Sequence, residues 1–419
     1  MSIPETFRKL QPAARAYLYG SAFMGAAQAV TWSFLTRWLN VQGYSKTEIG
    51  TFQSLDSWGK VAVALPAAFL LARRPARGVF VLSALIAGIV YIALPHLPSL
   101  RWMYAANFIA GLAMTVHYVA IAPFLFRHTG AAERAGVFSL AEAARTLAAV
   151  VGAGLAGFVV VRLAGPMGGE IPATSAVISG AGACSLIAAL FYARIDDPEP
   201  SMPVGSRVLP VVRQNAALLA RFAAPQFVIA CGAGFCIPFL PTYFQERFDV
   251  GPDGWGYLFA SGQVLMTGGF LMTPFILARL GFVKSMVAIE LSSLPFFLAL
   301  AFTTSLPVAM FAFLMRGALM NATHPIIKNL MMQATPAGAR EVQTGVNATL
   351  WGVGWVVGPL VAGRVLDATS DDYAVLMCTT VGLYLFAAIL TWTLLRGVER
   401  EVVEGGQGAP RPTEAGSAA

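Results

Sequence analysis

Long apolar stretches recur along the whole chain and are separated by short polar segments. Each stretch holds about 20–25 residues, enough for a helix rising ~1.5 Å per residue to cross a hydrocarbon core of roughly 30 Å. The pattern predicts twelve membrane-spanning helices, six over residues 14–40, 47–72, 79–97, 102–126, 135–163 and 174–194, and six over 222–245, 255–278, 285–304, 308–332, 342–366 and 373–396. The chain is therefore expected to be an all-α membrane protein.

The second half of the chain repeats residues of the first half at an offset of 206 positions. The matched pairs are Gly50 and Gly256, Arg73 and Arg279, Gly111 and Gly317, Met114 and Met320, Arg134 and Arg340, Gly152 and Gly358, and Gly157 and Gly363. Many secondary transporters are built from two such repeated halves. The repeat predicts two six-helix bundles.

A polar segment with four prolines separates the two halves (Pro198, Pro200, Pro203 and Pro210). Proline clusters between apolar stretches are typical of loops and linkers. We expect an N-terminal bundle over residues 1–194, a cytoplasmic linker over 195–221 and a C-terminal bundle over 222–400. The tail over 401–419 is rich in Gly, Pro and Glu and is expected to be disordered.

The composition is that of a membrane protein. The chain is 57% hydrophobic and 12% charged, with a mean hydropathy of +0.67, whereas soluble proteins carry about 25% charged residues. The net charge of +7 comes from basic residues spread over alternate short loops, so a nucleic-acid partner is not expected. This positive-inside distribution predicts a multi-pass protein of the plasma (inner) membrane, surrounded by lipid, with both termini cytoplasmic.

No pattern in the sequence indicates an enzyme, a cofactor or a metal site. The four cysteines (Cys184, Cys231, Cys236 and Cys378) lie within predicted helices and lack metal-ligand spacing. The chain has no G-x4-G-K-[ST] nucleotide-binding motif and no nucleophile–base arrangement. Any active transport must then be driven by an ion gradient or by the gradient of the solute.

Four segments carry a recognisable pattern. They are the basic loop Arg73–Gly78 with its repeat copy Arg279–Lys284, the helix segment Asn107–Gly111, the run Gly358-Pro359-Leu360-Val361-Ala362-Gly363, and the helix end Phe239–Phe244. Together they resemble the major facilitator superfamily over nearly the whole chain, and the Gly-Pro run is nearest to its drug–proton antiporter branch. The resemblance implies a monomer that carries a small molecule by alternating access.

Two residues depart from the superfamily pattern. The acid that usually stands in the basic loop is Ala72 in the first copy and Ala278 in the second. The arginine that the antiporter branch carries on helix 4 is Asn107 here. The roles that those residues have in the superfamily are therefore not carried over to this chain.

Charged side chains at membrane depth are candidates for a functional role because burying them in lipid is costly. On helix 2, Gln53, Asp56 and Lys60 share one face, which we expect to line the cavity between the bundles. On helix 5, Glu142 and Arg145 also share a face. Each acid could carry protons, or each could form an ion pair with its neighbouring cation that only fixes the helix.

Two further helices carry ionisable residues at depth. His117 on helix 4 could titrate near neutral pH, or could be a buried neutral histidine with one hydrogen bond. Arg316 on helix 10 has no acid within one turn, so it must find a partner on another helix or in the substrate. Helix 10 lines the cavity in the superfamily, so the resemblance implies a substrate or coupling role for Arg316. For Glu290 we expect an ion pair with a loop arginine.

Tryptophans beside amides suggest a cavity for an amphipathic organic molecule, although tryptophans also serve in packing and at membrane interfaces. The candidates for proton coupling are Asp56, Glu142 and His117. The candidates for the substrate cavity are Gln28, Trp32, Gln53, Lys60, Arg145, Gln226, Gln263, Arg316, Asn321, His324, Asn347 and Trp351.

The sequence predicts a secondary transporter that moves a small amphipathic organic solute, with proton-coupled efflux as the first hypothesis. The second hypothesis is uptake of an organic anion by proton symport, because Lys60, Arg145 and Arg316 all lie at cavity depth. A membrane sensor without transport activity is the third. It would have a cavity without titratable groups or large soluble domains, and the sequence indicates neither.

Overall fold

The computed structural model describes residues 11–71, 75–129, 134–196, 208–336 and 339–407. All regular secondary structure in these ranges is helical, which confirms the all-α fold. The long helices of the first half are α2 (Pro12–Val41), α3 (Lys46–Leu71), α4 (Ala76–Ala93), α5 (Leu100–Arg127), α6 (Arg134–Met167) and α7 (Glu170–Tyr192). Those of the second half are α9 (Ala216–Cys236), α11 (Pro252–Leu280), α12 (Phe282–Phe302), α13 (Leu306–Ala334), α14 (Arg340–Ala368) and α15 (Tyr373–Gln407).

Shorter helices complete the fold: α8 (Val208–Gln214), α10 (Leu240–Phe248) and the 3-10 turns η1 (Leu94–His96) and η2 (Ile237–Phe239). Within the described ranges, nine helices are long and apolar enough to cross a membrane, and the bent α11 makes ten. Helices α2 and α3, with 30 and 26 residues, are similar in length to these candidate spans. The structure is thus consistent with the twelve spans expected from the sequence.

The predicted elements differ from the structure in two details. The span expected over 222–245 lies within the candidate span Ala216–Phe248, but the 3-10 turn η2, which contains Pro238, interrupts its α-helix between Cys236 and Leu240. A proline lacks the N–H that would continue the helical hydrogen bonds. The tail was expected to be disordered from residue 401, but α15 continues to Gln407. The remainder of that tail and residues 197–207 of the predicted linker lie outside the described residues, while α8 and the first turns of α9 lie within the rest of that linker.

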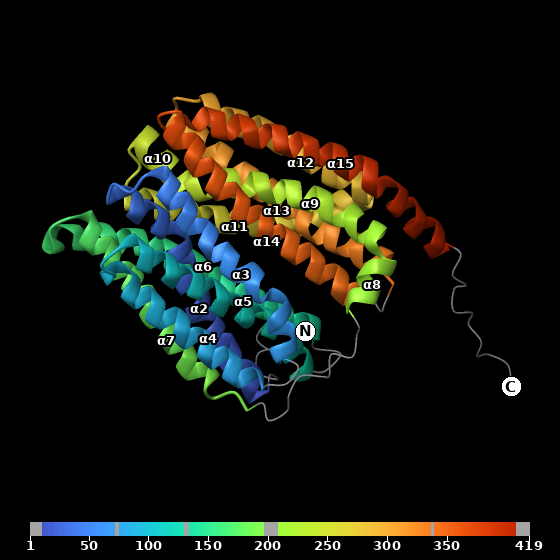
Figure 1. The fold of residues 1–419 in the computed structure, drawn as a ribbon, viewed down its shortest axis with the longest axis horizontal. Helices are drawn as coiled ribbons and strands as arrows, with labels where there is room; N and C mark the ends of the chain where they lie inside the picture. Colours follow the sequence, from blue (N-terminus) through green and yellow to red (C-terminus); the bar gives the residue numbers. More distant parts are fainter. Residues whose placement is uncertain (1–10, 72–74, 130–133, 197–207, 337–338, 408–419) are drawn as a thin grey trace.

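The helices form two groups, which we call the first bundle (α2 to α7) and the second bundle (α9 to α15). In the first bundle α2 packs on α6 and α7, and α5 packs on α3 and α4. In the second bundle α9 packs on α14 and α15, and α13 packs on α11 and α12. The bundles meet mainly along two helix pairs, α3 with α14 and α6 with α11. Figure 1 shows the blue-to-green and the yellow-to-red helices as two neighbouring layers.

Repeat-related glycines let the bundles approach closely at both helix pairs. A Cβ atom on Gly363 of α14 would overlap the carbonyl oxygen of Lys46 at the start of α3. The repeat copy of that glycine, Gly157 of α6, would likewise overlap Pro252 at the start of α11. Glycines at these positions allow backbone-to-backbone contact between helices in a membrane. The repeat seen in the sequence therefore reappears as two equivalent contacts between the bundles.

We call the end of the molecule with the α2–α3, α10–α11 and α14–α15 connections the closed end. The first turn of α3 lies at this end, and Ser45 and Glu48 form a capping box there. The backbone N–H groups of Lys46 and Thr47 donate to the carboxylate of Asp367, at 2.9 and 2.8 Å. An acid of the second bundle thus caps a helix of the first bundle.

An ion-pair cluster lies beside this cap. The ammonium of Lys46, with a side chain only 6% exposed, pairs with Glu246 of α10. It also donates to Asn40 at 2.6 Å and lies 3.8 Å from Asp371. The hydroxyl of Tyr373 donates to Glu246 at 2.7 Å. We call Lys46, Glu246 and Asp367 the latch, because together they join the two bundles at the closed end.

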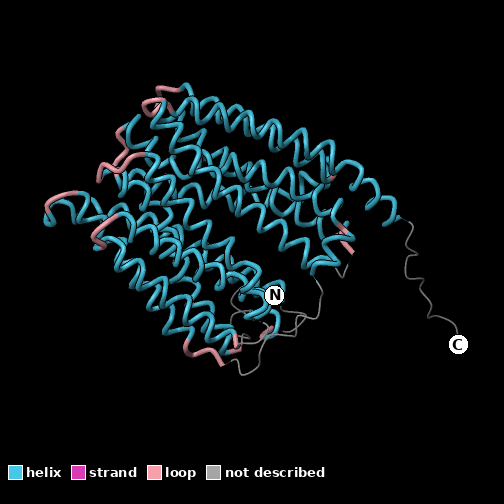
Figure 2. Tube along the Cα trace, viewed as in Figure 1, coloured by secondary structure: helices cyan, strands magenta, loops and turns pink. Residues whose placement is uncertain are grey.

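The opposite end, where α2 begins and α15 ends, is called the termini end. In the part of the chain that is described, every hydrogen bond between the bundles lies in the half nearer the closed end, down to Ser54 Oγ donating to the Val356 carbonyl. Toward the termini end the two groups of helices diverge, as the traces in Figures 1 and 2 show. The bundles are therefore joined at one end and separate at the other.

Candidate substrate site between the bundles

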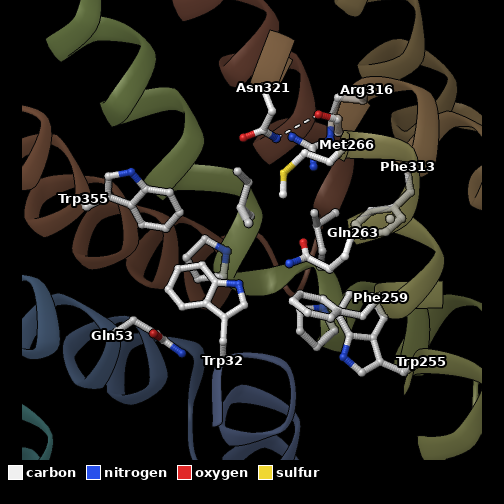
Figure 3. Close-up of a pocket in the computed structure, with 16 residues that line it drawn as sticks. Trp32, Gln53, Trp255, Phe259, Gln263, Met266, Phe313, Arg316, Asn321 and Trp355 are labelled. Carbon is white, nitrogen blue, oxygen red and sulfur yellow. Dashed lines mark hydrogen bonds between the residues drawn. The ribbon is translucent and has the colours of Figure 1, made fainter. Parts of the chain in front are cut away.

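A cavity of about 230 Å³ lies between the two bundles. The first bundle contributes Trp32 of α2 and Gln53 of α3. The second bundle contributes Ile237, Pro238, Leu240 and Pro241, together with side chains of α11, α13 and α14 (Trp255, Phe259, Gln263, Met266, Phe313, Arg316, Asn321 and Trp355). Figure 3 shows the indole of Trp32 projecting from the first bundle toward these side chains. Both bundles therefore form the walls of one site.

Aromatic rings make up much of the cavity wall. The ring of Trp32 lies 5.5 Å from that of Trp355 on α14. On the other side, Trp255 lies 6.2 Å from Phe259 and 5.7 Å from Phe313. The indole N–H of Trp255 donates to the Ser33 carbonyl at 2.8 Å, which fixes this ring across the bundle interface. Rings at these separations offer flat apolar surface to a bound molecule.

Arg316 brings a positive charge to this wall. Its side chain is buried, with 5% of the residue exposed. The guanidinium lies 5.3 Å from the ring of Phe297 and 5.8 Å from that of Phe313. Among the described residues it makes no hydrogen bond or ion pair, and its Nε atom is buried without a partner. The cavity therefore contains a cation whose charge the surrounding protein does not neutralise.

Three amide side chains complete the lining. Gln53 donates to the hydroxyl of Thr36 at 2.6 Å. Asn321 donates to the Gly317 carbonyl one turn earlier on α13, at 2.8 Å (Figure 3). Gln263 projects from α11 into the cavity. These groups provide hydrogen-bond donors and acceptors beside the rings.

The charged candidates of the first bundle form two ion pairs outside the cavity lining. Lys60 pairs with Asp56 at i,i+4. Arg145 pairs with Glu142 at i,i+3. Tyr118, whose hydroxyl donates to Gln28, lies within electrostatic range of Lys60 and of both members of the second pair. The cluster is next to the cavity because the Lys60 ammonium lies 5.9 Å from the Trp32 ring.

The other candidates lie elsewhere. His117 is buried on α5, 3.1 Å from the hydroxyl of Ser83 and against the ring of Phe80. The ring of His324 packs against Trp351 at 5.2 Å, and Asn347 has a buried side-chain oxygen without a hydrogen-bond partner among the described residues. Gln226 is buried within α9. None of these side chains belongs to the lining of the cavity described above.

The structure thus brings five of the predicted cavity residues together (Trp32, Gln53, Gln263, Arg316 and Asn321). The sequence analysis missed several aromatic residues of the wall, among them Trp255, Phe259 and Phe313. Their spacing on α11 and α13 is also that of residues that pack against neighbouring helices. Of the aromatic wall residues outside the predicted set, Trp355 is the one that the sequence could have indicated, because it lies on the same helix face as the predicted Asn347 and Trp351.

The environment of Glu290 corrects one expectation. We expected an ion pair with a loop arginine, but among the described residues Glu290 forms no ion pair. Its carboxylate lies 3.5 Å from the hydroxyl of Thr391 on α15, and its second oxygen is buried without a partner. Residue 290 lies on α12, away from the cavity, and is 1% exposed. It is a carboxyl group at membrane depth that forms no ion pair with a cation in the part of the chain that the structure describes.

The motif glycines serve helix packing. Gly152 lies against Ala26 of α2, and Gly358 lies against the backbone of α9 near Gly234. Gly157 and Gly363 make the contacts between bundles described above. Of the basic loop, Arg73 and Arg74 lie outside the described residues. Within the described ranges, no group of three or more His, Cys, Asp or Glu side chains could hold a metal ion.

Comparison with known proteins gives a family and a fold. The model of the Major Facilitator Superfamily matches residues 17–359. The crystal structure of the nucleoside transporter NupG is similar, with a TM-score of 0.75 and 14% identity over 92% of this chain and 100% of that one. A bacterial homolog of the human lysosomal transporter Spinster, in an inward-facing and occupied conformation, has a TM-score of 0.75 and 13% identity over 92% and 97%.

A D-xylose–proton symporter is also similar, with a TM-score of 0.71 and 13% identity over 93% of this chain and 98% of that one. Identities this low show a shared fold alone. No curated protein matches the chain in sequence.

Proposed function

The chain belongs to the Major Facilitator Superfamily, and we propose that it carries a small amphipathic organic solute across the membrane by alternating access. The observation that supports this proposal most strongly is the cavity between the bundles. Residues of both bundles line it, and its wall combines rings, amides and one unpaired cation. Such a wall suits a molecule with an apolar body and a few polar groups.

We propose that the termini end faces the cytoplasm and that the structure shows an inward-facing conformation. The basic loops at the termini end support this orientation. The latch then closes the external side, and the cavity is reached from the cytoplasm. Opening the latch while the termini end closes would expose the same cavity to the other side.

Protons are the proposed coupling ions, as in the D-xylose–proton symporter that shares the fold. Asp56 and Glu142 are the proposed carriers, and His117 is the third candidate. In this conformation each acid forms an ion pair with a cation of its own helix. Glu290 joins these candidates because it has no such cation.

Two versions of the proposal differ in direction. Uptake by proton symport is favoured by the unpaired charge of Arg316, which suits an organic anion. When the cell interior is electrically negative, moving an anion inward costs about 2.3 kcal/mol of free energy per charge for each 100 mV of membrane potential. A proton that enters with the anion cancels this cost. Efflux in exchange for protons is favoured by the Gly358-Pro359 run of α14, which resembles the antiporter branch. The packing of Gly358 explains that run without antiport, so we place uptake first.

We predict that replacing one proton-carrying acid abolishes proton-driven flux and leaves folding intact. Asp56→Asn, Glu142→Gln and Glu290→Gln are made separately, because each amide keeps the shape of the acid and cannot release a proton. Each purified variant is reconstituted into vesicles. Flux of an identified solute is then measured with and without a pH gradient, and at least one variant should lose the response to the gradient.

The matching control removes a charge outside the proposed pathway. Asp372 lies on the α14–α15 connection, where it caps α15 through a 2.9 Å bond from the Ala374 N–H group and forms no ion pair with any described residue. Asp372→Asn should retain the response to the gradient. If all three test variants respond to the gradient like the unmodified protein, these acids have structural roles and protons are not coupled through them.

A further inference from the structure

The charge of Arg316 requires a partner that none of the described residues provides in this conformation. Arginine keeps its charge under all physiological conditions, and leaving a buried charge unpaired is unfavourable. Two aromatic rings lie near the guanidinium, but rings offset only part of the lost hydration. Because Arg316 lines the cavity, the bound solute can provide the missing partner.

The surroundings indicate a partner with a single negative charge. Lys60 and Arg145, the two cations of the first-bundle cluster beside the cavity, already pair with Asp56 and Glu142. Arg316 therefore adds one uncompensated positive charge to the cavity. A carboxylate would neutralise it and could accept two parallel N–H bonds from the planar guanidinium. A doubly charged phosphate ester would leave one negative charge unpaired.

The remaining wall fits a flat apolar body. In Figure 3 the rings of Trp32, Trp255 and Phe259 lie on the opposite side of the cavity from Arg316 and Asn321. A molecule with its carboxylate on Arg316 would place its apolar part among these rings. The cavity of about 230 Å³ is smaller than the roughly 300–1,000 Å³ that is usual for drug-sized ligands. The body should therefore contain one or two rings.

We infer that the solute is an aromatic monocarboxylate, held by Arg316 at its carboxylate and by Trp32 and the facing rings at its aromatic part. This inference rests on the proposed transport function and adds the chemical class of the substrate to it. It assigns Arg316 to substrate binding and leaves proton movement to the acids named above.

The inference is tested by binding to the purified, detergent-solubilised protein. The probes are benzoate and 2-naphthoate, with benzamide, 2-naphthamide, benzylamine, phenyl phosphate and acetate as comparisons. Binding is followed by the thermal unfolding midpoint, because a ligand of the folded state raises it, and by tryptophan fluorescence, because Trp32 and Trp355 line the cavity. The aromatic carboxylates should raise the midpoint, and the amides, the amine and acetate should not.

Variants of α13 identify the residue that recognises the carboxylate. Arg316→Gln should weaken aromatic carboxylate binding by roughly 10- to 100-fold, the loss expected for a hydrogen bond to a charged group. Arg316→Lys should restore part of it, because it keeps the charge but not the planar geometry. Lys328→Gln is the control, since it removes an exposed cation three turns farther along the same helix.

The outcomes separate the inference from the proposed function. If the neutral amides bind as tightly as the carboxylates, or if Arg316→Gln and Lys328→Gln bind carboxylates equally, the inference is wrong and the transport proposal stands. If no probe of any charge binds to the folded protein, the cavity is not a solute site and both fail. If Arg316→Gln does not fold, the inference is tested on the unmodified protein alone, by comparing the binding of the negatively charged, neutral and positively charged aromatic probes.

Discussion

Replacing Gly363 by alanine is expected to shift the protein away from the conformation described above. The added Cβ atom would overlap the carbonyl oxygen of Lys46, and a backbone atom cannot move aside like a flexible side chain. Overpacking of this kind costs about 1–3 kcal/mol, which corresponds to a roughly 5- to 150-fold change in population. Gly157→Ala should act in the same direction, because its Cβ atom would overlap the Pro252 carbonyl.

This shift is measured by double electron–electron resonance, which gives the distance between two spin labels. The labels are attached at Gln42 and Ser370, one from each bundle at the closed end. Longer distances should gain population in both variants. Two glycines of the same helices provide matched controls. A Cβ on Gly345 of α14 would meet nothing within 4 Å, and one on Gly154 of α6 would make only ordinary contacts. The packing account fails if the control variants change the distances as much as the test variants do.

Breaking the latch is the second large effect that we expect. Lys46→Met removes the cation that pairs with Glu246 and leaves that carboxylate without its partner. Removing one member of a fully buried pair costs about 3–5 kcal/mol. Because the Glu246 side chain is 31% exposed, we expect roughly 2 kcal/mol, with the closed end opening more often.

Asp367→Asn tests the other half of the latch. It weakens the cap on the first turn of α3, with an expected loss of about 1 kcal/mol. Hydrogen exchange at the amides of Lys46 and Thr47, the two donors to Asp367, should become faster in this variant. Asp372→Asn in the same connection should leave these two amides unchanged, because the hydrogen bond that Asp372 accepts comes from Ala374 in the first turn of α15 and not from α3. Equal protection of both amides in all three proteins would mean that Asp367 does not hold the bundles together.

The fold could be predicted from the sequence because membrane helices have a simple signature. A stretch of about 20 apolar residues must become a helix in lipid, since every backbone polar group has to be satisfied internally. The offset that relates Gly157 to Gly363 also predicted two six-helix bundles, and in the structure both glycines lie at contacts between the two groups of helices. The 3-10 turn η2 within the span Ala216–Phe248 was not predicted, because a proline within an apolar stretch is compatible with either a regular or a locally distorted helix.

The site could be predicted only in part, and the reason lies in its chemistry. Polar residues at membrane depth such as Gln53 and Arg316 are conspicuous because lipid does not tolerate them. Phe259 and Phe313 are as apolar as lipid, so the sequence does not show whether their side chains face a cavity, a neighbouring helix or the membrane. Only the packing of α11 against α13 places them in the cavity wall.

Contacts between segments far apart in the chain could not be predicted from the sequence, for a different reason. Asp367 caps a helix that begins more than 300 residues earlier, and Glu290 meets Thr391, 101 residues away. Spacing rules along one helix cannot identify such partners. The absence of a nearby acid did indicate that Arg316 lacks a partner on its own helix. Which group completes its environment depends on the neighbouring helices and on the solute.

Access to the cavity from each side of the membrane tests the central claim most directly. A single cysteine is placed at Gln263 in a variant whose four native cysteines are replaced by serine or alanine. A membrane-impermeant thiol reagent is then applied to right-side-out and to inside-out vesicles. Alternating access predicts labelling from both sides, with faster labelling from the side of the termini end and a shift toward the other side in Gly363→Ala. Labelling from one side only, unchanged by Gly363→Ala, would contradict the account.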